Sequence, residues 1–162
     1  MTEQKTDHAS LARELFYEGY NCAQSVFCAF SDCTGIDRET SARLSSSFGG
    51  GLGRMREVCG AVSGASMVLG AVCGYSDPAD KDAKKKHYEL VRSFADRFRE
   101  TEGSIICREL LRRGNADENT VKPGGDPEER TEAYYKKRPC PELVFRAAYI
   151  LEKMVEEKES KK

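Results

Sequence analysis

Apolar residues recur at helical spacing along almost the whole chain, and runs that alternate as strands do are nearly absent. Leu11, Leu15 and Phe16 mark a first amphipathic stretch near the N-terminus. From about 58 to 73 nearly every residue is apolar or small, which predicts a helix that is buried on most sides. The pattern therefore predicts an all-α fold, a single compact domain of five or six helices around this central helix.

Charged and loop-forming residues follow the predicted central helix. Asp77-Pro78 is typical of a helix start and opens a charged helix to about residue 100, and a last helix spans about 142–158. Residues 115–138 contain Pro123-Gly124-Gly125-Asp126-Pro127 and predict a long surface loop, a kind of segment that is often functional. We treat 1–162 as one helical domain with polar tails.

The composition narrows the classes of function. Lys plus Arg number 26 and Asp plus Glu number 27, so the balance gives no indication of a nucleic-acid partner. No run of about 18 apolar residues occurs, and the first residues are polar, so we expect no membrane span and a cytoplasmic location. Seven cysteines are many for such a chain. Because a reducing compartment disfavours permanent disulfides, they favour catalytic or metal-binding use.

Four of the cysteines follow residues typical of helix starts, where unpaired backbone N–H groups and the helix dipole stabilise a thiolate. These four are Cys22, Cys59, Cys107 and Cys140. Cys22 follows Asn21, a good helix cap, with Gln24 at capping-box spacing. Cys140 lies between two prolines where the last helix is expected to begin. The other three, Cys28, Cys33 and Cys73, fall within a helix or at helix C-termini.

The segment Cys59-Gly60-Ala61-Val62-Ser63-Gly64 places two glycines one helical turn apart, so a second backbone can approach that face. With the other three helix-start cysteines, it resembles the redox-active protein family named for its C_GCAxxG_C_C pattern. Cys22 matches the first cysteine of the family, and Cys107 and Cys140 match the last two. The resemblance spans about 11–151. It implies an all-helical domain with a redox role, and some relatives are associated with electron-transfer proteins that hold iron–sulfur clusters.

Two kinds of redox site fit four such cysteines. The first is thiol–disulfide exchange, as in a thiol-dependent oxidoreductase, and the second is a four-thiolate site for an iron–sulfur cluster or zinc. Because no Cys-x-x-Cys occurs, tertiary folding must assemble either site. Thiol–disulfide exchange ranks first, with Cys59 as nucleophile because it heads the most buried helix and follows two arginines. A third interpretation is a helical interaction module with structural cysteines.

The glycine-rich run at 49–53 lies shortly before Cys59. No strand signal precedes it and no Gly-Lys-Ser/Thr follows, so a phosphate-binding P-loop is not expected. Its glycines, with Arg54 and Arg56, are candidates to admit an anion or substrate to the Cys59 thiolate. With the motif residues, the candidate set for this approach is Gly50, Gly51, Arg54, Gly60, Ala61 and Gly64. We expect a small-molecule or protein redox partner, and a homo-oligomer stays open. His8 and His87 lie in polar or charged segments and are expected at the surface.

Overall fold

The computed structural model describes residues 4–161, which fold almost entirely as helices. In chain order these are α1 (His8–Tyr17), α2 (Cys22–Ala29), α3 (Ser31–Thr34), α4 (Arg38–Ser45), a 3-10 helix η1 (Ser46–Phe48), α5 (Gly60–Cys73), α6 (Lys81–Glu102), α7 (Cys107–Arg113), α8 (Glu118–Val121), α9 (Glu132–Lys137) and α10 (Cys140–Ser160). The all-α prediction is confirmed. Of the ten α-helices in the described range, six have at least eight residues, and the rest are one or two turns long.

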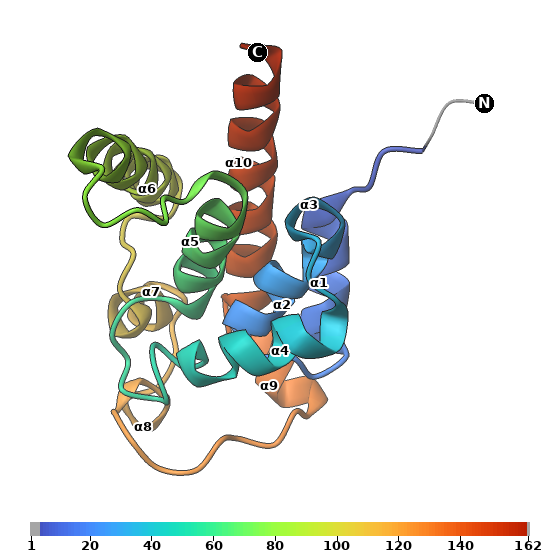
Figure 1. The fold of residues 1–162 in the computed structure, drawn as a ribbon. Coiled ribbons are helices and arrows are strands. Elements are labelled where there is room, and N and C mark those ends of the chain that lie inside the picture. The colour runs from blue at the N-terminus through green and yellow to red at the C-terminus, as the bar shows by residue number, and fades with distance from the viewer. Residues whose placement is uncertain (1–3, 162) are drawn as a thin grey trace.

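The core forms where α1, α2 and α5 pack against α10, which runs most of the height of the molecule (Figure 1). The predicted central helix is α5, whose first two-thirds bury small and branched side chains such as Ala61, Ala65 and Val68. Farther along the chain, α6 buries Phe94 and Phe98 and exposes its charged face. The periodicity of apolar residues thus located the main core helices correctly.

Two glycines allow α2 to lie unusually close to α5. A Cβ atom on Gly64 would lie 2.6 Å from the carbonyl oxygen of Ala23, closer than real Cβ atoms approach oxygen. A Cβ on Gly60 would lie 3.1 Å from the Ala23 nitrogen and 2.9 Å from the Phe48 oxygen. The sequence prediction that a second backbone approaches this helix face is confirmed. As a consequence, Cys22 at the start of α2 lies beside the start of α5.

The segment 115–138 is more ordered than the long loop that the sequence predicted. It contains α8 and α9, so this expectation was wrong for two short stretches. Each has a side-chain cap at its start: Asp117 accepts a hydrogen bond from the Thr120 nitrogen at 2.8 Å, and Thr131 accepts one from the Tyr134 nitrogen at 3.2 Å. In Figure 1 the segment passes below the core on its way from α7 to α9.

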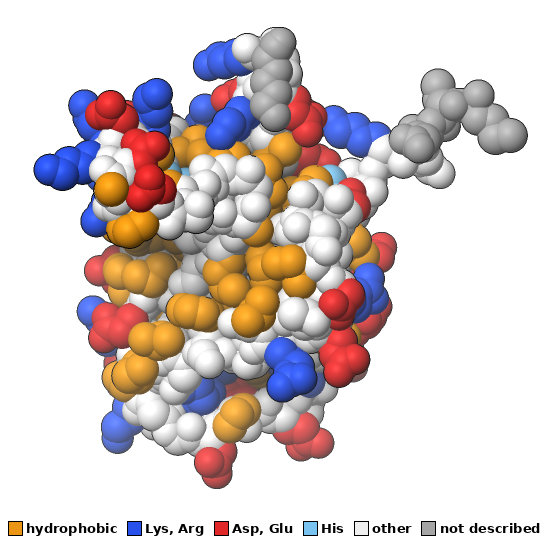
Figure 2. All heavy atoms as spheres, viewed as in Figure 1, with side chains coloured by type: hydrophobic (Ala, Val, Ile, Leu, Met, Phe, Trp, Pro, Cys, Tyr) orange, Lys and Arg blue, Asp and Glu red, His pale blue; other side chains and the backbone are white. Residues whose placement is uncertain are grey.

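Hydrophobic side chains cover the middle of the face viewed in Figure 1, and charged side chains lie mostly around its margin (Figure 2). The large apolar side chains exposed on the protein as a whole include Leu44, Leu52, Met55, Val58 and Val72. None of the described helices combines the length and the apolar character that a bilayer-spanning segment needs.

Candidate functional site

All four cysteines singled out by the sequence lie at helix starts. Cys22, Cys107 and Cys140 are the first residues of α2, α7 and α10, and Cys59 is the residue that precedes α5. The capping box predicted at α2 is present: the Asn21 side chain accepts from the Gln24 nitrogen at 2.9 Å, and the Gln24 side chain accepts from the Asn21 nitrogen at 3.0 Å. The local predictions for these positions are therefore confirmed.

These four cysteines line one cavity of about 320 Å³. Cys59 and Cys140 are buried in its wall, and Cys22 and Cys107 are partly exposed. The fold therefore brings together four thiols that lie dozens of residues apart in the chain. The other three cysteines lie elsewhere: Cys28 is buried in α2, Cys33 is exposed in α3, and Cys73 is at the end of α5.

Backbone pairing holds Cys59 and Cys107 next to each other. The Cys59 nitrogen donates to the Ile105 oxygen at 2.8 Å, and the Cys107 nitrogen donates to the Glu57 oxygen at 2.6 Å. Gly51 has a positive φ of 73° and packs against Cys107. A Cβ on Gly51 would lie 2.7 Å from the Cβ of Cys107. The glycine-rich loop is therefore shaped to fit around a cysteine, and a side chain at Gly51 would displace it.

The other candidate residues, from the glycine-rich run and from the Cys59–Gly64 motif, fall into two groups in the structure. Gly50, Gly51, Arg54 and Gly60 line the cavity, which is where a residue that admits an anion or a substrate would have to lie. Ala61 and Gly64 are buried outside the lining, and Gly64 packs directly on α2. The motif therefore contributes Gly60 to the cavity wall and Gly64 to the contact between α5 and α2.

Arg56 brings a positive charge into the protein interior beside the thiols. It is 1% exposed, adopts a left-handed φ of 59°, and its Nη1 lies 3.8 Å from the Sγ of Cys107. Among the described residues, its Nε and Nη2 atoms are buried and have no hydrogen-bond partner. Because a buried guanidinium without an anion is costly, this position favours negative charge in the cavity.

Two further arginines in the lining were not singled out from the sequence. Arg138 forms an ion pair with Glu128 at 2.7 Å and lies over the ring of Tyr134. Arg130 donates to two carbonyl oxygens at and beyond the end of α1 and also lies over Tyr134. Arg138 precedes Cys140 by two residues, a proximity that the sequence does show. Arg130 and Tyr134 carried no such signal, since they reach the cavity only through the fold of the segment between α8 and α10.

Burial and neighbouring charges in the cavity wall raise the pKa of some of these thiols and lower that of another. Burial, with repulsion from neighbouring thiolates, raises the pKa of Cys59 to about 12, although the backbone N–H groups of Ala61 and Val62 oppose the rise. Burial also raises the pKa of Cys107, and the adjacent Arg56 opposes it. A helix start alone therefore does not make these two thiols acidic in the absence of a metal.

Cys140 is the exception. A hydrogen bond from the Cys22 thiol lowers the pKa of Cys140 to about 7, and Arg138 and other nearby arginines contribute despite its burial. The same interaction keeps the proton on Cys22 and raises its pKa. The sequence pointed to Cys59 as the most reactive thiol, but in the folded protein the charges and hydrogen bonds favour Cys140.

One histidine is not where the sequence placed it. His8 was expected at the surface of a polar tail, yet it is only 6% exposed. Its ring stacks on Phe30 with centroids 4.2 Å apart, and both ring nitrogens contact carboxylates. The expectation was wrong because α3 and α10 pack over the start of α1.

Comparison with known families bears on the same four cysteines. The family model described as "Putative redox-active protein (C_GCAxxG_C_C)" matches residues 20–154, a segment that contains all four cavity cysteines. The chain belongs to the C_GCAxxG_C_C family. The resemblance read from the residues is thereby confirmed, and membership supports a redox role in general terms. No curated protein and no solved structure gave a significant match to the chain.

Proposed function

We propose that this protein is an electron carrier in which Cys22, Cys59, Cys107 and Cys140 hold an iron–sulfur cluster. The observation that carries the proposal is that four thiols from four helix starts line one cavity. Four cysteine thiolates are the usual ligand set of [2Fe–2S] and [4Fe–4S] clusters. A dithiol mechanism would use two of the four, whereas a cluster accounts for all of them.

The distribution of the thiols favours a cluster over a single zinc ion. In the part of the chain that the structure describes, the one set of three or more candidate ligands close enough to share an ion is His8, Asp32 and Cys33. The cavity cysteines instead surround a common space. Structural zinc needs four sulfur atoms about 2.3 Å from one point, while a cluster has several metal atoms that ligands reach from different sides.

The charges in the cavity wall also fit this donor set. Thiolates and inorganic sulfide together outweigh the charge of the iron, so a four-cysteine cluster is anionic. Arg56 supplies a buried positive charge whose Nε and Nη2 make no hydrogen bond within the described residues, and Arg138 lies in the same wall. A negative charge in the cavity would offset the cost of burying Arg56.

When bound, such a cluster supplies one-electron transfer at a potential set by its surroundings. The residues of the chain would provide those surroundings. The Ala61 and Val62 nitrogens donate toward the sulfur of Cys59, and Arg56 lies against Cys107, so both stabilise thiolate character. Partial exposure at Cys22 and Cys107 leaves a short path for an electron to a docked small molecule or protein.

Thiol–disulfide exchange is a second candidate, favoured by the hydrogen bond between Cys22 and Cys140. The Cys140 thiolate would attack a disulfide of the partner, and one partner sulfur would leave as a thiol. Cys22, having given its proton to that leaving sulfur, would then attack the Cys140 sulfur and release the second partner sulfur, which takes a proton from water. The partner disulfide is reduced to two thiols, and Cys22 and Cys140 are oxidised to a disulfide.

Anaerobic purification separates the two candidates. The cluster proposal predicts a brown protein with iron and acid-labile sulfide in equal amounts, and a loss of both in each of four Cys→Ser variants at the cavity. Cys73→Ser is the matched control, because Cys73 lies outside the cavity, and it should keep its iron. A colourless protein in which mild oxidation joins Cys22 to Cys140 would support thiol–disulfide exchange instead.

A further inference from the structure

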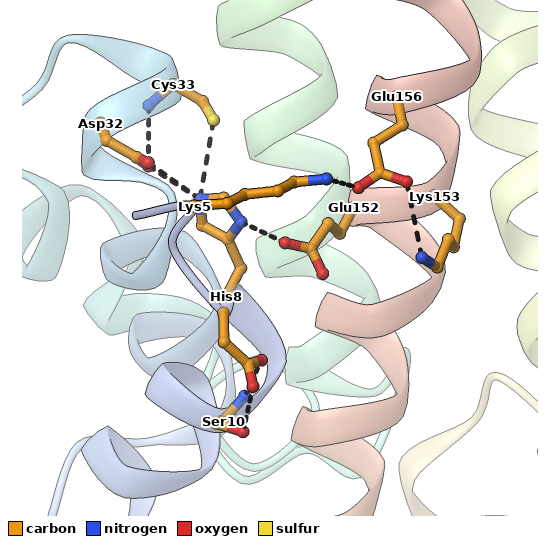
Figure 3. A network of polar contacts seen from close by, with 9 residues as sticks. Lys5, His8, Ser10, Asp32, Cys33, Glu152, Lys153 and Glu156 are labelled. Carbon is orange, nitrogen blue, oxygen red and sulfur yellow. Dashed lines mark hydrogen bonds and ion pairs between the residues drawn. The ribbon is translucent and has the colours of Figure 1, made fainter. Parts of the chain in front are cut away.

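A second group of metal-ligating side chains lies away from the cysteine cavity, where α1, α3 and α10 meet. The Nε2 atom of His8 lies 2.9 Å and 3.0 Å from the two carboxylate oxygens of Asp32, and 3.8 Å from the Sγ of Cys33. One ligand atom from each of the three residues lies within 4.8 Å of the others. Figure 3 shows the imidazole of His8 with Asp32 and Cys33 on one side and Glu152 on the other.

We propose that His8, Asp32 and Cys33 bind a divalent metal ion of the zinc type. Imidazole nitrogen, thiolate and carboxylate oxygen are the three ligand types that Zn²⁺ accepts, and water would complete a four-coordinate site. The three side chains come from two helices, and His8 lies 24 residues before Asp32, so the site exists only in the folded protein.

The distances require little adjustment. A tetrahedral zinc site with ordinary bond lengths separates nitrogen from sulfur by about 3.6 Å and nitrogen from carboxylate oxygen by about 3.4 Å. The sulfur of Cys33 is already at 3.8 Å from Nε2. Asp32, at 2.9 Å, must move back by about half an ångström to admit the ion. Its side chain is about half exposed, so it has room to do so.

The other ring nitrogen of His8 is held as a metal-binding histidine requires. Nδ1 lies 2.9 Å from Oε1 of Glu152, a largely buried carboxylate on α10. An Nδ1–H donated to this carboxylate holds the ring as in many zinc-bound histidines. Nε2 then faces Asp32 and Cys33, and the proton that it shares with Asp32 would leave when the ion binds. Stacking on Phe30 fixes the plane of the ring. The histidine is therefore oriented before any ion arrives.

Binding would link three separate parts of the fold. The ion would join α1 to α3 directly, and the Glu152 contact would extend the link to α10. Cys33, which is outside the family's cysteine pattern, would then have a role of its own. This site does not share a residue with the cysteine cavity, and it does not depend on the function proposed above.

The test is titration of the anaerobically purified protein with Co²⁺ and Zn²⁺, comparing wild type with Cys33→Ser. Wild type should bind one more Co²⁺ per chain than the variant and show a sulfur-to-cobalt charge-transfer band that the variant lacks. Zn²⁺ should displace this cobalt and raise the melting temperature of the wild type only. Glu152→Gln should weaken binding by about 10–100-fold, as expected for a carboxylate that orients a ligand.

Cys73→Ser is the control for a cysteine outside both sites and should bind as wild type does. Asp32→Asn gives a second disruption of the site at an exposed position, in case removal of a buried group such as His8 affects folding. Iron content should be the same in Cys33→Ser as in wild type, because Cys33 lies outside the cysteine cavity. Measuring iron in the same samples therefore tests the cluster proposal independently of this site. Equal cobalt binding and equal zinc-induced stabilisation in wild type and Cys33→Ser would overturn the proposed site.

Discussion

Replacement of Gly64 by alanine tests the close contact that places Cys22 beside Cys59. The new Cβ would lie 2.6 Å from the Ala23 carbonyl oxygen, a backbone atom that moves only if α2 moves. Overpacking of this kind costs about 1–3 kcal/mol. Alanine also favours a helix over glycine by about 1 kcal/mol, so this gain must be separated from the clash.

Gly70→Ala provides that separation within the same helix. A Cβ on Gly70 would meet nothing within 4 Å, so this variant keeps the gain in helix propensity without the clash. The difference in unfolding free energy between the two variants therefore isolates the contact, and we expect Gly64→Ala to be less stable by about 1–3 kcal/mol. Urea denaturation measures this difference in unfolding free energy. In thermal unfolding, each kcal/mol corresponds to a shift of about 2–4 °C in the melting temperature. If Gly64→Ala were as stable as Gly70→Ala, the close-approach argument would be refuted.

Three other predictions concern the thiols, the helix cap and the buried charge. In reduced, metal-free protein, the rate of alkylation of Cys140 should rise with pH through a midpoint near 7, its lowered pKa, and level off above it. Cys59 should stay protonated and unreactive at pH 9, because burial raises its pKa to about 12. Mass spectrometry of the labelled peptides measures both. Asn21→Ala removes the capping box and should lower the unfolding free energy by about 1 kcal/mol in urea denaturation. If the cavity holds the proposed cluster, Arg56→Met should lower its reduction potential by about 60 mV for each 1.4 kcal/mol of lost charge stabilisation. The exposed Arg43→Met should leave the potential unchanged in a redox titration.

The helix starts and the close helix contact were predictable because their causes are local. Asn21 and Gln24 form a capping box through residues three apart, and the Gly60–Gly64 spacing needs only one helical turn. The gathering of four cysteines in one cavity was predicted from their shared placement and from the family pattern. Its details were not, because the pairing of Cys59 with the backbone before Cys107 joins segments almost fifty residues apart.

The residues that the sequence did not identify owe their positions to long-range packing. Arg130 and Tyr134 reach the cavity because the segment after α8 folds back over the end of α1. His8 is buried by contacts with residues 24 and 144 positions away, which no local pattern around a polar N-terminal segment indicates. The effect of a helix start on the Cys59 thiol was also not enough to lower its pKa, because burial outweighs it.

Iron K-edge X-ray absorption of the anaerobically purified protein tests the central claim most directly. If the four cavity cysteines hold a cluster, the iron should have a shell of sulfur neighbours and a second shell of iron, and the signal should be absent in Cys59→Ser but retained in Cys73→Ser. Protein that contains no iron, or iron bound mainly by nitrogen and oxygen, would contradict the assignment of this cavity as a cluster site.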